Sequence, residues 1–204
     1  MILEMKELGI KSVIDELRKR NVHLEKMKAL DFFAREGDWQ TKYYADLVDS
    51  IDAWEIDPKF ENKLRENLPQ AKITIGDSHE LARKSNSKYD IIVLDNPQSC
   101  YGNYCEHFDA LESVLPLLPK RGIIIFNVKT VPFNYENNLS WKSKRNSFYG
   151  RDASSLDNEF VEKFYKDFFH KKKLQTEFFF YKERPQELNL YSYVFSLVRE
   201  NYEE

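Results

Sequence analysis

The chain alternates short apolar runs with polar segments in which apolar residues recur at helical intervals. Five apolar or β-branched runs predict buried strands, at residues 28–31, 53–57, 71–75, 89–95 and 121–127. The segments between them predict helices, at residues 39–51, 58–68, 78–83 and 104–118. Strands joined by crossover helices lie parallel in one sheet that is covered on both faces. The pattern therefore predicts an α/β fold with a mostly parallel sheet.

The alternation changes after the fifth predicted strand. Residues 129–152 are polar and aromatic without a clear period, and we expect them to form a long loop on the substrate side. Residues 152–170 carry apolar side chains along one helical face and predict a helix. Two last strands, at residues 174–182 and 188–198, are separated by a short connection. They predict an antiparallel hairpin at the end of the chain.

Length and composition fit one domain that spans residues 1–204, of which 42% are hydrophobic. An amphipathic segment at residues 8–24 predicts a helix within an N-terminal extension of residues 1–27. The formal net charge of −3 argues against nucleic-acid binding through bulk charge alone. Acids interrupt the first residues where a secretory signal needs an apolar core, and no apolar run is long enough to cross a bilayer. We expect a soluble, cytoplasmic protein without a membrane partner.

The segment at residues 28–41 predicts a strand, a tight loop and the start of a helix. An apolar run ends at Asp31, and the loop passes through Gly37 before the helical segment begins. In an open parallel sheet, ligands bind at the carboxyl ends of the strands. The first backbone N–H groups of a following helix are also unpaired and point outward. This loop is therefore the predicted cofactor site.

Other predicted strands also end in acidic residues. Glu55 and Asp57 close the second strand, Asp77 follows the third, and Asp95 ends the fourth. Asp57 precedes Pro58, and we expect it to cap the next helix. Ser78 is the predicted N-cap of the helix after the third strand.

The order of these elements resembles the seven-stranded, Rossmann-like fold of class I S-adenosylmethionine-dependent methyltransferases, over nearly the whole chain. The first loop resembles the motif D-x-F-A-G-S-G, which is typical of members that methylate amines of DNA or RNA. The positions that agree are Asp31, Phe33, Ala34 and Gly37. Arg35 replaces a glycine that lets the backbone approach the methionine part of the cofactor, and Glu36 replaces a serine. The resemblance implies that this loop binds S-adenosylmethionine, either with Arg35 turned away or with its guanidinium on the cofactor's carboxylate.

The resemblance also assigns cofactor contacts to later strand ends. Glu55 matches the acid that accepts hydrogen bonds from the ribose hydroxyls, and Asp77 with Ser78 matches the pair beside the adenine. Ile56 is placed to flank the adenine, whereas Trp54 fits the core equally well. Asp95 completes the predicted cofactor-binding set.

The acceptor side of the resemblance rests on the segment Asp95-Asn-Pro-Gln98. It falls where amino-methyltransferases carry (D/N)-P-P-Y, and it keeps the acid and the second proline. The implied catalytic residues are Asp95, Asn96 and Pro97, which orient the target amine toward the methyl group. The aromatic residue of the motif is missing, so Tyr101 or Tyr104 would have to supply a platform for a flipped base.

Several alternatives remain open at this stage. Asp95 and Asn127 also resemble part of the cation site of small-molecule O-methyltransferases, but Phe126 replaces the acid of that site, and we expect no metal. His79 and His107 follow strand ends and are candidate bases, although capping or surface positions suit them better. Cys100 and Cys105 are expected to be reduced thiols.

The acceptor is not specified by the sequence. A nucleic-acid amine is favoured by the two motifs, whereas the acidic net charge favours a small molecule that receives the methyl group on oxygen or nitrogen. A third possibility is a protein with this fold that binds a partner without catalysis, because Arg35 crowds the cofactor loop. The oligomeric state is equally unspecified.

Overall fold

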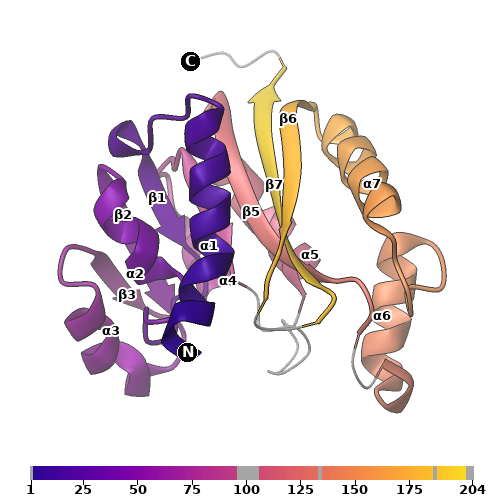
Figure 1. The fold of residues 1–204 in the computed structure, drawn as a ribbon, viewed down its shortest axis with the longest axis horizontal. Coiled ribbons are helices and arrows are strands. Elements are labelled where there is room, and N and C mark those ends of the chain that lie inside the picture. The colour runs from indigo at the N-terminus through magenta and orange to yellow at the C-terminus, as the bar shows by residue number, and fades with distance from the viewer. Residues whose placement is uncertain (1, 96–105, 133–134, 186–187, 201–204) are drawn as a thin grey trace.

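The core of the protein is one sheet of seven strands in the computed structural model, which describes residues 2–95, 106–132, 135–185 and 188–200 (Figure 1). The strands are β1 (Lys28–Asp31), β2 (Ser50–Glu55), β3 (Lys72–Ile75), β4 (Ile91–Leu94), β5 (Arg121–Lys129), β6 (Leu174–Glu183) and β7 (Leu190–Arg199). Their order is β3-β2-β1-β4-β5-β7-β6. β1 to β5 are parallel, and β7 lies antiparallel between β5 and β6. The predicted fold class and terminal hairpin are confirmed.

Helices connect these strands and cover both faces. The α-helices are α1 (Ile2–Lys19), α2 (Thr41–Tyr44), α3 (Glu61–Asn67), α4 (Ser78–Lys84), α5 (His107–Val114), α6 (Leu139–Tyr149) and α7 (Asn158–Lys171). Short 3-10 helices complete the connections, at η1 (Leu24–Lys26), η2 (Ala45–Leu47), η3 (Pro58–Phe60), η4 (Leu115–Leu117) and η5 (Tyr135–Asn137). Among the described residues, none of the helices combines the length and the apolar character that crossing a bilayer requires.

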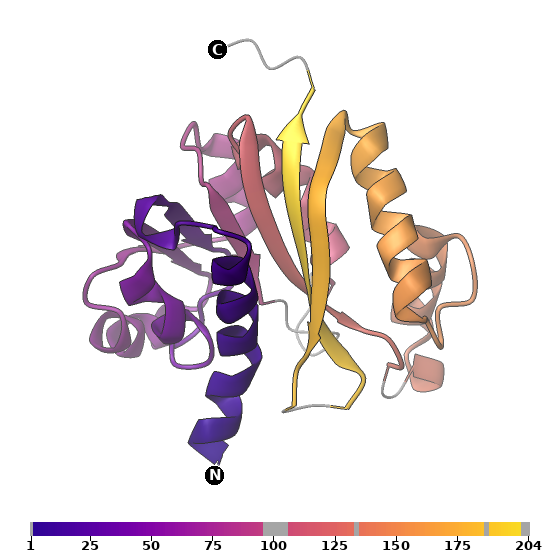
Figure 2. The ribbon, with the colours of Figure 1, turned by 45° about the horizontal axis from the view of Figure 1, so that its top comes forward.

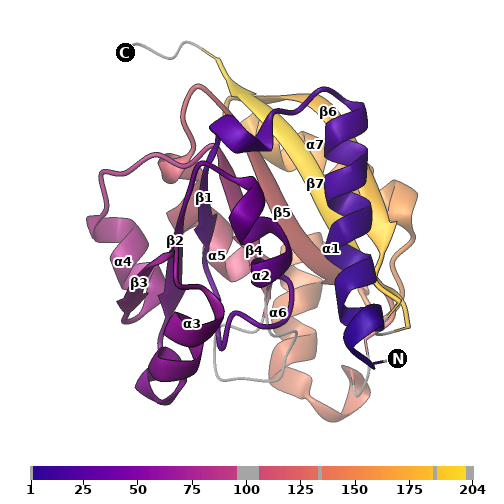
Figure 3. The same ribbon diagram turned by 60° about the vertical axis from the view of Figure 1, so that its left-hand side comes forward.

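Alternation along the central strands divides the interior into two cores, because successive side chains of a strand point to opposite faces. Ile123 and Ile125 of β5 join the core under α1, α2 and α3. Ile124 and Phe126 join the core under α4, α5 and α7. Figures 1 and 3 show these two helical layers on opposite sides of the sheet, and in Figure 2 α1 lies beside the β6–β7 hairpin. Both faces of the central strands are thus buried, as their continuous apolar sequences require.

The prediction of a long irregular loop at residues 129–152 is wrong. This segment contains η5 and the 11-residue helix α6, which begins after the N-cap Asn138 and ends before the C-cap Gly150. The helix buries Trp141, Arg145 and Tyr149, which are spaced four residues apart on one face. Because the middle residue of this buried stripe is an arginine, the hydrophobic period that indicates a buried helix is interrupted.

Other predicted boundaries also differ from the structure. α1 occupies Ile2–Lys19 and not residues 8–24, and the helix expected at residues 39–51 is limited to α2 and η2. That helix is short because β2 already begins at Ser50. α7 begins at Asn158. Its N-cap is Asp157, whose side chain accepts a hydrogen bond from the Phe160 N–H at 2.6 Å. Residues 152–157 therefore precede α7 and do not form its first turns.

Candidate cofactor and acceptor site

Three acidic side chains lie where parallel strands end at one edge of the sheet. Asp31 is the last residue of β1, Glu55 is the last residue of β2, and Asp95 directly follows β4. In the register of the sheet, Asp31 pairs with Ala53 and with Val93. Glu55 and Asp95 therefore each lie two residues further along the strands that flank Asp31.

Asp31 is buried beneath the loop that follows β1. Its side chain accepts hydrogen bonds from the Thr41 hydroxyl and from the backbone N–H of Phe33, the latter at 3.3 Å. Burial raises the pKa of Asp31 to about 7, and the nearby charge of Asp95 adds to the increase, while the hydrogen bond from Thr41 opposes it. Asp31 thus ties the start of α2 to the end of β1.

Gly37 makes the tight loop after β1 possible. Its φ angle is +71°, and a Cβ there would lie 2.8 Å from the Leu68 side chain and 2.9 Å from that of Leu64. The Gly37 N–H donates to the carbonyl of Ala34 at 2.7 Å, and the Ala34 N–H donates to the carbonyl of Trp54 at 2.9 Å. The loop is therefore fixed both within itself and to β2.

Arg35, the substituted position of the motif, adopts a left-handed conformation with φ of +49°. Its guanidinium lies 5.5 Å from the centre of the Phe60 ring, in η3 after β2. Its backbone N–H donates to Glu55 Oε2 at 2.7 Å. The side chain is thus directed at Phe60, and whether its guanidinium contacts the carboxylate of a bound cofactor stays a prediction.

Glu55 is buried, with 7% of its surface exposed, and it holds two loops. Oε2 accepts the Arg35 N–H, and Oε1 accepts the Asp57 N–H at 2.8 Å. A carboxylate has about four acceptor positions, so each oxygen keeps a further lone pair. The next residue, Ile56, is 60% exposed, whereas Trp54 is 5% exposed and belongs to the core. The structure thus resolves the alternative for Trp54 in favour of packing.

Asp77, and not Ser78, is the N-cap of α4, which corrects the sequence prediction. Asp77 Oδ1 accepts from the backbone N–H groups of His79 and Glu80, at 2.8 and 3.2 Å. The carboxylate reaches these donors because Asp77 has an extended backbone, while Ser78 is already the first helical residue. The preceding Gly76 N–H donates to the Glu55 carbonyl at 2.8 Å and links the ends of β3 and β2.

Asp95 is held by side chains from three distant parts of the chain. Oδ1 accepts from Arg184 Nη1 at 2.6 Å and from the side-chain amide of Asn127, and Oδ2 accepts from Gln40 Nε2 at 3.2 Å. Gln40 lies in the loop after β1, Asn127 in β5, and Arg184 in the connection between β6 and β7. Neither Gln40 nor Arg184 could be predicted from the sequence, because no local pattern indicates a contact such as that of Arg184 with Asp95, 89 positions away.

The remaining predicted acceptor residues, Asn96 and Pro97, and the alternative platform residues Tyr101 and Tyr104 lie outside the described residues. The pair Asp95 and Asn127, which resembled part of a cation site, is hydrogen-bonded within itself. Among the described residues, no group of three or more histidine, cysteine, aspartate or glutamate side chains is arranged to hold a metal ion.

Neither candidate histidine occupies a surface or capping position. His107 is fully buried, stacks on Phe126 at 4.6 Å between ring centres, and shares a hydrogen bond with Tyr165. Burial holds its pKa well below the usual range, with a further contribution from Arg145. His79 is buried against Phe32, and burial lowers its pKa too. Both side chains are buried, and in both burial favours the neutral form of the ring.

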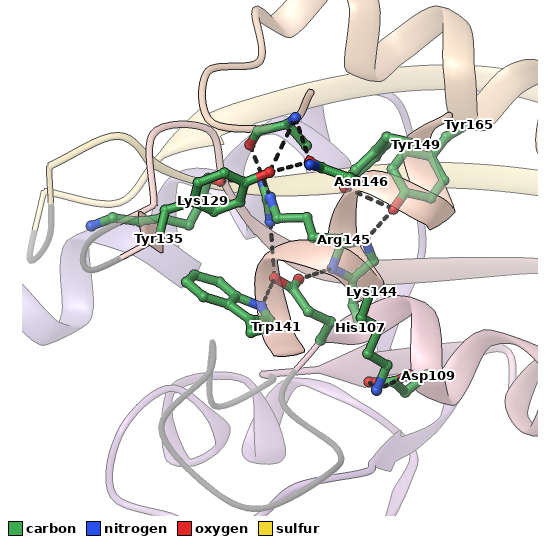
Figure 4. A network of polar contacts seen from close by, with 12 residues as sticks. His107, Asp109, Lys129, Tyr135, Trp141, Lys144, Arg145, Asn146, Tyr149 and Tyr165 are labelled. Carbon is green, nitrogen blue, oxygen red and sulfur yellow. Dashed lines mark hydrogen bonds and ion pairs between the residues drawn. The ribbon is translucent and has the colours of Figure 1, made fainter. Parts of the chain in front are cut away.

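A buried polar network joins α6 to the residue before α5 (Figure 4). Glu106 Oε1 accepts from Trp141 Nε1 and from Arg145 Nη1, both at 2.9 Å. Arg145 also donates to the carbonyls of Lys129 at 2.6 Å and Ala153 at 3.2 Å. The network therefore connects the end of β5, α6 and the approach to α7.

Two hollows of the surface lie away from the carboxyl edge. One, of about 380 Å³, is lined by α5, α6 and α7 residues that include Phe108, Lys144 and Phe168. The other, of about 230 Å³, lies over β2 and β3 and includes Asp52 and Lys72. The predicted acids of the site line neither of them.

Comparison with known proteins connects this geometry to a fold family. No model of a protein family matches the sequence, and no curated protein matches it. Among solved structures, M. jannaschii TYW2 in complex with AdoMet superposes with a TM-score of 0.54 at 16% identity, over 91% of this chain and 75% of that chain. The chain has the class I methyltransferase fold.

Further solved structures with the methyltransferase fold are similar to this chain. One is described as a putative RNA methyltransferase from Pyrococcus horikoshii, with a TM-score of 0.58 at 16% identity over 95% of this chain and 82% of that one. Another is described as a putative caffeoyl-CoA O-methyltransferase from Staphylococcus aureus, with a TM-score of 0.55 at 15% identity over 92% and 81% of the two chains. The expected resemblance to class I methyltransferases is confirmed at the level of the fold.

Proposed function

We propose that this protein transfers a methyl group from S-adenosylmethionine to an amine of a nucleic acid. The observation that carries the proposal is the meeting of Asp31, Glu55 and Asp95 at one carboxyl edge of a methyltransferase fold. In M. jannaschii TYW2 a protein with this fold is found in complex with AdoMet. The sulfonium of that cofactor supplies an activated methyl group.

The ribose is assigned to Glu55 in this proposal. Its two oxygens already order the loops at Arg35 and Asp57, and their remaining lone pairs suit the two neighbouring hydroxyls of a ribose. The exposed Ile56 offers an apolar contact for the adenine. Asp77 and Ser78 are assigned to the edge of the adenine. The hydrogen bonds that cap α4 use Oδ1 of Asp77, so its Oδ2 is the oxygen assigned to the adenine.

The methionine part of the cofactor is assigned to the loop after β1. The loop residues are Asp31, Phe33, Ala34, Arg35 and Gly37. The Ala34 and Gly37 amides already make backbone hydrogen bonds that fix the shape of the loop. The guanidinium of Arg35 is turned to Phe60, which supports a path for the cofactor that does not cross this side chain.

Asp95, with Asn96 and Pro97, is assigned to the acceptor. Methyl transfer is an in-line displacement, so it depends chiefly on holding the nucleophile at the right distance and angle. Arg184 offsets the charge of Asp95 at 2.6 Å, which weakens the attraction of the carboxylate for an alkylammonium group. A neutral, weakly basic amine, such as the exocyclic amine of a nucleobase, suits this arrangement and keeps its lone pair at neutral pH.

Transfer of a labelled methyl group tests the proposal. Purified protein is incubated with S-adenosylmethionine carrying a tritiated methyl group and, separately, with total RNA, genomic DNA and a low-molecular-weight cell extract. We expect label in a nucleic acid, and a rate that falls as salt rises, because phosphate contacts weaken with ionic strength. Label confined to the small-molecule extract would instead support the small-molecule alternative.

Asp95→Asn provides the matched test of the acceptor assignment. We expect it to lower transfer by about 100-fold with a much smaller effect on the affinity for S-adenosylhomocysteine, since Asp95 is assigned chiefly to the acceptor and Glu55 to the ribose. The control is Asp90→Asn at the opposite end of β4, where Asp90 accepts the Lys28 N–H at 2.9 Å. If Asp95→Asn transfers the methyl group as fast as Asp90→Asn and the wild type, Asp95 has no part in the mechanism.

The non-catalytic alternative has one observation in its favour, which is that both oxygens of Glu55 already accept backbone N–H groups. Calorimetry with S-adenosylmethionine and S-adenosylhomocysteine separates the two functions. Binding of both ligands is expected for an enzyme. Absence of binding would favour a protein that uses the fold only to contact a partner.

A further inference from the structure

Arg184 is a buried cation beside the residue assigned to the acceptor. It follows the last residue of β6, and only 4% of its surface is exposed. Its backbone N–H donates to the Leu190 carbonyl at 2.8 Å, which fixes it at the base of the β6–β7 connection. That connection lies at the same end of the sheet as the carboxyl ends of the parallel strands (Figure 1).

The hydrogen bonds to Asp95 differ between its two oxygens. Oδ1 receives the charge-assisted bond from Arg184 at 2.6 Å together with the amide of Asn127. Asn127 is itself held, because its side-chain oxygen accepts from the Ser192 hydroxyl at 3.1 Å. Oδ2 receives a longer bond, from Gln40 at 3.2 Å. The strong bonds therefore fix Oδ1, and Oδ2 is the oxygen that can exchange its partner.

A need for stability does not explain this ion pair well. The Arg184 side chain is 5% exposed and that of Asp95 is 23% exposed, so burying the guanidinium carries most of the desolvation cost, and apolar residues of similar size often replace buried ion pairs without loss of stability. The guanidinium is also not saturated, since its Nε has no hydrogen-bond partner among the described residues. The arrangement instead determines the orientation of one carboxylate at the edge of the sheet.

We propose that Arg184 is a positioning residue, which holds Asp95 by Oδ1 so that Oδ2 is presented to the methyl acceptor. The inference rests on the proposed function, in which Asp95 orients the acceptor. Gln40 occupies Oδ2 in the structure and releases it when the acceptor amine donates in its place. Because Gln40 lies in the loop after β1, this exchange also connects the acceptor to the cofactor loop.

Turnover with RNA tests whether Arg184 affects methyl transfer. Arg184→Met is compared with Arg199→Met, a control on β7 whose guanidinium donates to the Leu115 carbonyl at 2.9 Å. We expect Arg184→Met to lower kcat for transfer into total RNA by about 100-fold, because a misplaced acceptor loses the aligned geometry. The affinity for S-adenosylhomocysteine should not change. Ethylguanidinium added to Arg184→Ala should restore part of kcat, a response that a merely structural role does not give.

A second measurement is independent of turnover. In ¹⁵N spectra, the side-chain amide signals of Gln40 and Asn127 should shift in Arg184→Met and stay in place in Arg199→Met. Unchanged signals in both variants would overturn the positioning role, whichever acceptor is used. If the wild type methylates nothing while the signals shift in Arg184→Met, the proposed function is contradicted and the hold of Arg184 on Asp95 stands. Equal kcat for wild type and Arg184→Met would also overturn the inference.

Discussion

The buried ion pair between Glu106 and Arg145 gives the most quantitative test of the structure. Both side chains are 0% exposed, and their atoms Oε1 and Nη1 are 2.9 Å apart (Figure 4). Burial raises the pKa of Glu106, and the charge of Arg145 and the Trp141 N–H oppose that increase. The perturbation is Arg145→Met, which keeps most of the side-chain volume and removes the charge and the donors.

The expected cost follows from the contacts that Arg145→Met removes. Glu106 would keep Trp141 as a donor but would lose its counter-ion, and removing one partner of a buried pair costs about 3–5 kcal/mol. The carbonyls of Lys129 and Ala153 would also lose a donor, which adds about 1 kcal/mol or more for each that water does not reach. We therefore expect a loss of at least about 3 kcal/mol, a large part of the stability of an ordinary domain.

The assay is unfolding in urea, followed by circular dichroism and by the fluorescence of the tryptophans, which include Trp141. Glu106→Gln and the double variant Glu106→Gln/Arg145→Met complete a thermodynamic cycle. The double variant should lose less free energy than the sum of the single variants, because neither charge is then left without its partner. The reasoning would be refuted if Arg145→Met cost less than about 1 kcal/mol, or if the two single losses simply added.

Three further predictions concern the loop after β1. Gly37→Ala should destabilise the protein by about 2 kcal/mol in urea unfolding, and by more than the control Gly150→Ala. Both glycines have positive φ, but a new Cβ at Gly37 would meet described side chains within 4 Å and one at Gly150 would not, so equal losses would contradict this reasoning. The raised pKa of Asp31 favours the protonated carboxyl in the folded state, so the wild type should lose stability as pH rises from 3.8 to about 7, and Asp31→Asn should not show this loss. Parallel plots of unfolding free energy against pH for the two proteins would contradict this. Arg35→Ala should change the calorimetric affinity for S-adenosylmethionine by less than about threefold, because the guanidinium lies on Phe60, and a larger loss would assign it to the cofactor.

The sequence alone predicts those parts of the fold that local patterns determine. The β-branched run before Asp95 and the acid-terminated run before Gly37 correctly indicate parallel strands, and the short connection near Arg184 correctly indicates a hairpin. Helix α6 was missed because its buried face includes Arg145, whose burial depends on Glu106, a residue 39 positions away. A polar side chain inside a helix cannot be told from a surface residue until its partner is known.

In the candidate site, too, the residues at strand ends could be predicted and the contacts between distant residues could not. Asp31, Glu55 and Asp95 were predicted because strand ends are visible in the sequence, and the topology brings those ends to one edge. The contacts of Asp95 with Gln40 and Arg184 were not predicted, because they depend on how the hairpin and the first loop pack against β4. The roles assigned to these acids in cofactor and acceptor binding stay predictions.

The central claim is that the carboxyl edge of this sheet binds the nucleoside of S-adenosylmethionine through Glu55. Calorimetric titration of S-adenosylmethionine into wild type, Glu55→Gln and Asp52→Asn tests it most directly. Asp52 is the matched control, a buried acid on the same strand that accepts from the Tyr89 hydroxyl at 2.6 Å. We predict that Glu55→Gln weakens binding by at least about tenfold, as expected for loss of charged hydrogen bonds, and that Asp52→Asn leaves it unchanged. Equal affinity of Glu55→Gln and wild type would contradict the claim.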